Sequence, residues 1–192
     1  MTGNGARAFH GLDFHMVPGI EADESVDFVV KEGEEVAIQD QVFTTSGDVI
    51  VERGGKLTIR DAEVIFNHTG HYEHGIILKG NTTLQIYQSQ IRGVKKHFFF
   101  MVYNTTLILE DSKIRMTDIL CGNTSRISIV RSDLWAVHCL NESTAYVLNA
   151  HLCYLFLRGR SSARVDNSHM IEILLYDRSK ASISDTTLKN VF

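Results

Sequence analysis

The sequence repeats a short pattern of apolar residues about eight times, and this repeat limits the fold more than any other feature. Each copy holds two apolar-x-apolar pairs separated by a polar turn, then an Asp or Asn turn, a small residue and a closing apolar residue. The copies begin at Phe28, Val49, Ile76, Phe99, Ile119, Val137, Leu155 and Ile173, and the last three intervals are 18 residues each. We therefore expect a stack of similar coils over residues 28–192, preceded by a short capping segment over residues 1–27.

Apolar residues alternate with period two inside each copy, which predicts strands with one buried face. The first strands are predicted to point these pairs inward: Phe28/Val30, Val49/Val51, Ile76/Leu78, Phe99/Met101, Ile119/Cys121, Val137/Cys139, Leu155/Leu157 and Ile173/Leu175. Because one repeat cannot close a core alone, strands of successive copies pair in parallel about 4.8 Å apart. The predicted fold class is all-β, a single-stranded parallel β-helix, or β-solenoid, of about eight coils.

The turn residues agree with this fold. Residues that tolerate a left-handed backbone precede the last corner of most copies: Asp40, Asp61, Asp111, Asn149, Asn167 and Asp185. Small residues follow directly: Ala62, Ser89, Ser112, Ser132, Ala150, Ser168 and Thr186. The second-strand core residues also change from Leu57, Leu84 and Leu107 to Ala145, Ala163 and Ala181, as a narrowing coil requires.

The coil spacing, the corner residues and segments such as GDVIVERGGKLTI (residues 47–59) resemble the right-handed parallel β-helix, or pectin-lyase-like, superfamily. Within it they are similar to uncharacterised secreted and archaeal surface repeat proteins. The resemblance covers about residues 28–190 and implies a right-handed coil. Members include pectate lyases and other polysaccharide-active enzymes, whose groove follows the face of the first strands.

In this chain the outward positions of the first strands are apolar in almost every copy. We expect them to form an exposed interface: Ile50, Ile77, Phe100, Leu120, His138, Phe156 and Leu174. An apolar stripe of this length exceeds what a soluble monomer usually exposes. A homodimer that pairs these faces is the first expectation, and coverage by the N-terminal segment or by an adjacent domain are the alternatives.

Three histidines, His68, His71 and His74, lie close together in the longest copy and are the candidate metal ligands. A solvated polar loop explains them equally well, because their spacing matches no standard site. His138, His151 and His169 are expected to occupy different repeat positions and to form no ladder.

No group of carboxylates with neighbouring Arg or Lys is predicted on the first-strand face, so no catalytic residue carries over from the enzymes of the superfamily. No cofactor is predicted. The favoured function is a non-catalytic structural, adhesive or scaffold module that self-associates through the apolar face. The alternative is a carbohydrate-active enzyme, of the lyase or glycosidase type, or a carbohydrate-binding domain.

Composition restricts the partners. A net charge of −4 and a pI near 6.1 argue against a nucleic-acid partner. We expect no transmembrane segment, and residues 1–10 lack the pattern of a signal peptide. Five Asn-x-Ser/Thr sequons, at Asn67, Asn81, Asn104, Asn123 and Asn141, favour an extracellular or cell-surface location. Asn followed by a small hydroxyl residue is also common in turns, which explains the sequons without glycosylation. Cys121 and Cys139 are expected to be buried free thiols in adjacent coils.

Overall fold

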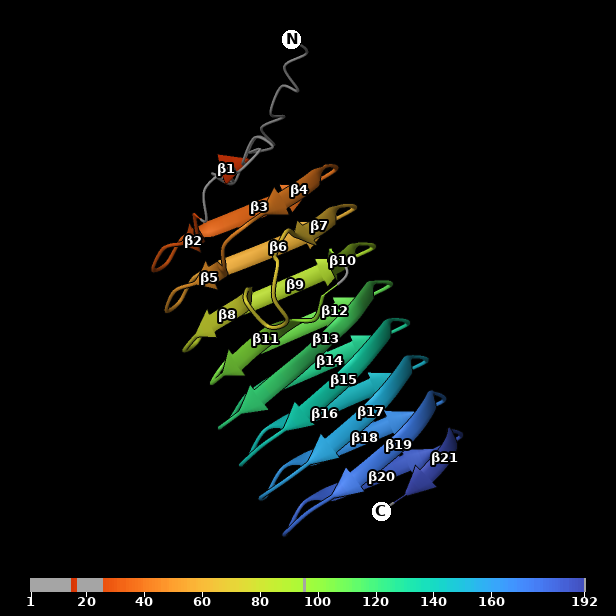
Figure 1. The fold of residues 1–192 in the computed structure, drawn as a ribbon. Helices are drawn as coiled ribbons and strands as arrows, with labels where there is room; N and C mark the ends of the chain where they lie inside the picture. Colours follow the sequence, from red (N-terminus) through yellow and green to blue (C-terminus); the bar gives the residue numbers. More distant parts are fainter. Residues whose placement is uncertain (1–14, 17–25, 95, 192) are drawn as a thin grey trace.

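The computed structural model describes residues 15–16, 26–94 and 96–191 and forms a parallel β-solenoid of about eight turns (Figure 1). Strands from successive coils lie side by side along one axis, from β2 near the N-terminal end to β21 near the C-terminal end. All strand pairs of the described chain are parallel, and the described residues contain no helix. The predicted fold class is confirmed.

Two sheets form the walls of the solenoid. Sheet A has nine strands, one from each second-strand position plus β1. They are β1 (His15–Met16), β3 (Glu35–Gln39), β6 (Lys56–Arg60), β9 (Thr83–Tyr87), β12 (Thr106–Glu110), β14 (Arg126–Val130), β16 (Thr144–Leu148), β18 (Ser162–Asp166) and β20 (Lys180–Ser184).

Sheet B has twelve strands and contains both the first and the closing strands of the repeat. Its main path is β2 (Phe28–Val30), β5 (Val49–Val51), β8 (Gly75–Lys79), β11 (Phe98–Tyr103), β13 (Lys113–Gly122), β15 (Asp133–Cys139), β17 (His151–Leu157), β19 (His169–Leu175) and β21 (Thr187–Val191). Beside this path lie the closing strands β4 (Val42–Thr45), β7 (Glu63–Phe66) and β10 (Gln90–Gly93).

The coils change shape at β13. The first three coils keep the closing strand separate from the first strand of the next coil, whereas β13, β15, β17 and β19 run through both positions. The pairing of β13 with β15 is irregular between Ile114 and Asp118, where residues 115–117 face the single residue Trp135. Met116 has a φ of 56° there, as expected at a bulge. Losing the separate closing strand explains why later coils need only 18 residues.

The core is one continuous column of apolar side chains between the two sheets. Its second-strand members run in register from Leu57, Leu84 and Leu107 to Ala145 and Ala163, so the predicted taper is confirmed. In the last coil the inward positions Leu175 and Ile183 are exposed. They face inward as predicted, but no following coil of the described chain packs on them.

The predicted register of the fourth coil is wrong by one residue. Phe100, not Phe99, pairs with Ile76 and Ile119, and Phe100 is 0% exposed. The run of residues 98–102 is apolar at every position, so alternation alone could not fix its register. The ring of Phe99 lies outside over Gly75, where a Cβ would come within 2.8 Å of it. Phe100 is therefore a core residue, and Met101 takes its place in the outward column.

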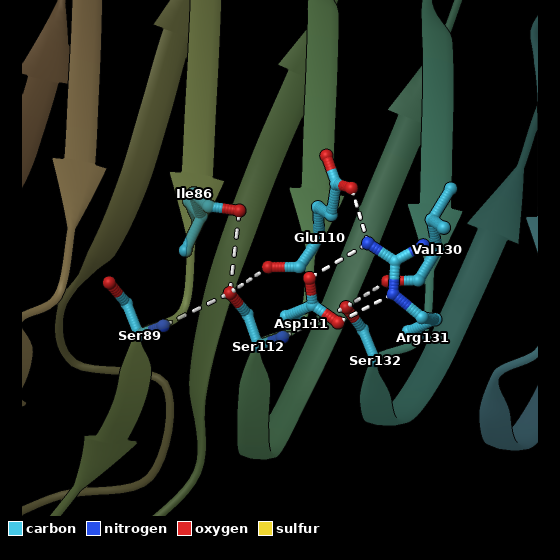
Figure 2. A network of polar contacts seen from close by, with 8 residues as sticks. All are labelled: Ile86, Ser89, Glu110, Asp111, Ser112, Val130, Arg131 and Ser132. Carbon is cyan, nitrogen blue, oxygen red and sulfur yellow. Dashed lines mark hydrogen bonds and ion pairs between the residues drawn. The ribbon is translucent and has the colours of Figure 1, made fainter.

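The left-handed corner residues are confirmed. All six Asp and Asn residues predicted there have φ between 45° and 53°, and Gln88 and Arg131 adopt the same conformation in the two remaining coils. The small residues that follow form a hydroxyl ladder (Figure 2). The Ser112 hydroxyl accepts from the backbone N–H of Ser89, and the Ser132 hydroxyl accepts from that of Ser112, at 3.2 and 3.1 Å. Where the corner residue carries a hydroxyl (Ser89, Ser112, Ser132, Ser168 and Thr186), it thus satisfies a backbone N–H of the preceding coil.

Most of the predicted N-terminal cap, residues 1–14 and 17–25, lies outside the described residues. Strand β1 pairs in parallel with β3 through Val36 and Ala37, and so covers the first edge of sheet A. Cys121 and Cys139 are paired in register, buried and free, as expected. The hydrogen bond with Cys139, together with burial, raises the pKa of Cys121.

Candidate functional site

The outer face of sheet B carries the predicted interface column. Ile50, Ile77, Leu120, Phe156 and Leu174 lie there and are partly exposed, as is the Met101 side chain that replaces Phe100. His138 lies in the same column, paired with Leu120 and Phe156. The structure thus places six of the seven predicted interface residues on one face, but it does not leave that face uniformly apolar.

A loop at the end of the second coil, between β7 and β8, reaches this face. Its base is closed by the Glu73 carboxylate, which accepts hydrogen bonds from the backbone N–H groups of Gly70 and Thr69, both at 2.9 Å. These bonds lower the pKa of Glu73. The backbone N–H of Tyr72 donates to the carbonyl of His97 at 2.7 Å, and the N–H of His97 donates to Nδ1 of His71 at 3.2 Å. The loop is therefore fixed against the segment that leads into β11.

Asp118, in β13, joins this loop to the sheet. Its Oδ2 accepts a hydrogen bond from the Tyr72 hydroxyl at 2.5 Å, and its Oδ1 lies 3.4 Å from Nε2 of His138. The hydrogen bond from His138 holds the pKa of Asp118 below its ordinary value, against the opposing effect of burial. The hydrogen bond to Asp118 raises the pKa of Tyr72 to about 12. At neutral pH Asp118 is therefore ionised and Tyr72 is a neutral donor.

Aromatic and imidazole rings surround Asp118. From Tyr72, each ring lies within 6.5 Å of the next, centroid to centroid, and the circuit returns to Asp118 through His138. The members are Tyr72, His97, Trp135, Tyr154, Phe156 and His138, and we call them the aromatic ring. Tyr72 is 48% exposed and Trp135 is 42% exposed.

A small residue occupies the middle of this arrangement. Ala136 pairs with Asp118 on one side and Tyr154 on the other, so it holds an outward position of the sheet. It is nevertheless only 2% exposed. Large neighbouring side chains therefore cover this position, and the aromatic ring stands above the strand backbone around it.

The predicted metal ligands do not meet as one ligand set. The ring of His68 is buried and stacks with His74 at 6.5 Å, whereas His71 lies against His97, with ring centroids 5.3 Å apart. Burial lowers the pKa of His68, and Nδ1 of His74 lies 3.8 Å from Asp48. Among residues 15–16, 26–94 and 96–191 no three His, Cys, Asp or Glu side chains are placed to hold a metal ion.

The expectation that His151 and His169 form no ladder is wrong. They are 18 residues apart, which is the length of one late coil, so they pair in register. Their rings stack at 4.8 Å with an interplanar angle of 1°. This stack lines a shallow groove of about 560 Å³ at the corner that carries the hydroxyl ladder.

Four of the five sequons have a local structural explanation. Asn81, Asn104, Asn123 and Asn141 hold the left-handed position of the turn between first and second strands, with φ between 54° and 61°. Two residues after Asn123 and Asn141, Ser125 and Ser143 are buried, and each hydroxyl bonds to a backbone carbonyl. The turn itself thus favours Asn-x-Ser at these places.

The sequence pattern did not single out Tyr72, Asp118, Trp135 or Tyr154, which the structure brings together on the first-strand face. One signal was present: Asp118 is a charged residue at an outward position directly before the strand pair Ile119/Cys121. Comparisons with protein-family models, with curated proteins and with solved structures found no match to this chain. No helix in the described part of the chain is long and apolar enough to cross a membrane.

Proposed function

We propose that this chain is a non-catalytic recognition solenoid that binds carbohydrate at the aromatic ring around Asp118. The observation that carries the proposal is the placement of exposed Trp135 and Tyr72 beside an ionised carboxylate on one rigid face. A sugar ring offers C–H groups on one face and hydroxyl groups at its edge. Aromatic faces attract the first through their negative quadrupole, and a carboxylate accepts strong hydrogen bonds from the second.

The rigidity of the site supports binding. Trp135, Asp118 and Tyr154 stand on adjacent strands of a parallel sheet, and Tyr72 is fixed by its bonds to His97 and Asp118. Side chains that are already ordered lose little conformational entropy when a ligand binds, so more of the contact energy becomes affinity. Tyr and Trp are also the residues that supply most contact energy at recognition surfaces.

The distance from Asp118 to the next acidic residue on its register line favours binding over hydrolysis. Glycosidases use two carboxyl groups about 5–9.5 Å apart. In the register of sheet B, Asp118 pairs with Ala136, Ala136 with Tyr154, and Tyr154 with Glu172. Glu172 therefore lies three strands away from Asp118. Three strand spacings are about 14 Å. The lowered pKa of Asp118 also makes this group a poor proton donor at neutral pH.

The test is retention in gels that contain a polysaccharide, over a panel of neutral and acidic polymers. Wild-type protein is expected to be retarded by at least one polymer. Trp135→Ala and Tyr154→Ala should abolish the retardation. Tyr146→Ala is the matched control, because Tyr146 is an exposed tyrosine of β16 in sheet A, outside the aromatic ring. Equal retardation of all four proteins would place any binding elsewhere.

Self-association is the second candidate, and the outward column of sheet B favours it. The column runs from Ile50 through Ile77, Met101 and Leu120 to Leu174 over most of the solenoid. We propose that a second copy of this chain, or an adjacent domain, covers the part of the column beyond the aromatic ring. In both candidates the solenoid is an adhesive or scaffold module, and the sequons support a cell-surface or secreted location.

A further inference from the structure

A second pocket lies away from Asp118, at the turn between first and second strands of the last two coils. Its volume is about 580 Å³. Six residues line it, three cationic and three with hydroxyl groups: Arg160, Ser161, Ser162, Arg178, Ser179 and Lys180. No acidic residue lines the pocket, although the chain as a whole carries a net charge of −4. The cations are therefore concentrated locally.

The cationic side chains of this pocket come from neighbouring coils, and acidic residues do not neutralise all of their charge. The backbone N–H of Arg178 bonds to the carbonyl of Gly159, and Lys180 pairs with Ser162, so Arg178 lies one strand spacing from Arg160. Like charges in neighbouring register positions repel each other. Arg160 Nη1 lies 3.6 Å from Glu142 of the preceding coil. Arg178 and Lys180 form no ion pair with any residue of the described chain.

A buried hydroxyl group in the lining is also unpaired. Ser161 is 0% exposed, and its Oγ has no hydrogen-bond partner among the described residues. The equivalent hydroxyls one coil before and one coil after do have partners: Ser143 bonds to the carbonyl of Cys121, and Ser179 bonds to that of Leu157. Leaving a buried donor unsatisfied costs free energy, so Ser161 has a donor available for a ligand oxygen.

We propose that this pocket binds a tetrahedral oxyanion, a sulfate or phosphate group, between the guanidinium groups of Arg160 and Arg178, with Lys180 completing the charge. Guanidinium groups present paired donors that match two oxygens of such a group. The bound anion would relieve the repulsion between the stacked arginines. This site is independent of the aromatic ring, and either can exist without the other.

The experiment is calorimetric titration of the full chain with inorganic sulfate and, separately, inorganic phosphate, with sodium chloride added to keep ionic strength constant. We expect saturable binding of one anion per chain. Arg178→Gln should weaken it about tenfold, as expected for loss of a charge-assisted contact. The anion that binds more tightly identifies the ester group the pocket prefers.

The matched control is Arg158→Gln. Arg158 belongs to the same turn and has the same charge, but it pairs with Asp177 at 3.5 Å and does not line the pocket. This variant should bind as wild type does, and the melting temperatures of both variants should show that each is folded. Equal weakening by both substitutions would mean general counter-ion attraction and would overturn the proposal. So would the lack of saturable binding by either anion up to about 10 mM, a concentration at which even weak specific sites are occupied.

Discussion

The hydroxyl group of Tyr72 donates a hydrogen bond to the carboxylate of Asp118, which lies 46 residues further along the chain. This bond ties the loop of the second coil to strand β13. His138 approaches the other oxygen of Asp118, so one carboxylate joins three separate coils. The aromatic ring exists only because these coils stack in this order.

Replacement of Asp118 by Asn tests this junction through pH. The folded-state pKa of Asp118 is lowered, so its contribution to stability is fully present above the unfolded-state pKa of about 3.9 and is lost as pH falls through the folded-state pKa. Asp118→Asn should therefore unfold at a lower urea concentration than wild type at pH 7. The difference should shrink as pH falls below about 4. A difference in urea midpoint that stays constant from pH 7 to strongly acidic buffer would show that the hydrogen bonds to Asp118 do not stabilise its ionised form.

Two substitutions test the hydroxyl ladder at the corner: one removes a hydroxyl group from it and the other adds one. Ser112→Ala removes the acceptor for the buried N–H of Ser89 and should cost about 1–3 kcal/mol. Ala150 interrupts the same ladder, because it offers no hydroxyl to the neighbouring Ser132. Ala150→Ser should add stability of about 0.5–1.5 kcal/mol. Urea unfolding of both variants measures this, and changes of the same sign would contradict the ladder.

The corner conformation predicts a stabilising substitution at Gln88. This residue has a φ of 48° at a position where six other coils use Asp or Asn. A left-handed backbone is costly for most residues and less so for Asn. Gln88 is exposed, so Gln88→Asn disturbs little packing and should raise stability by about 0.5–1 kcal/mol. A drop in melting temperature would show that the corner imposes no strain on Gln88.

Self-association and the corrected register are tested by one pair of substitutions. Phe100→Asp places a charge in the core and should prevent folding, as judged by loss of β-sheet circular dichroism. Met101→Asp places the same charge on the outer face and should leave the fold intact. If a second copy covers that face, Met101→Asp should also lower the mass measured by light scattering. A wild-type chain that is monomeric at every concentration would remove the dimer from the account.

The fold was predictable from the sequence because its signals are local and repeated. Alternating apolar pairs recur in every coil, Asn or Asp at the left-handed corner and a small residue after it recur in most coils, and the structure places them as expected. The exceptions also have local causes. In residues 98–102 five consecutive apolar residues left the register open, and Gly75 decides it by making room for Phe99 outside.

The site was not predictable in the same way. Asp118, Trp135 and Tyr154 are brought together only by the register of β13, β15 and β17, which depends on the bulge after Ile114. Tyr72 comes from a loop that occurs in one coil. The repeat pattern contains only the features that all coils have in common, whereas the residues of this site come from features that occur in single coils.

Trp135 is the only tryptophan of the chain, so its fluorescence reports directly on the proposed carbohydrate site. The most direct test is titration of the protein with the polysaccharide that retards it in the gel assay, with tryptophan emission as the readout. We predict a saturable blue shift, because a sugar ring stacked on the partly exposed indole removes water from it. Asp118→Asn should weaken this response about tenfold, and Tyr146→Ala should leave it unchanged. Emission that does not change with any polymer of the panel would contradict the proposed site.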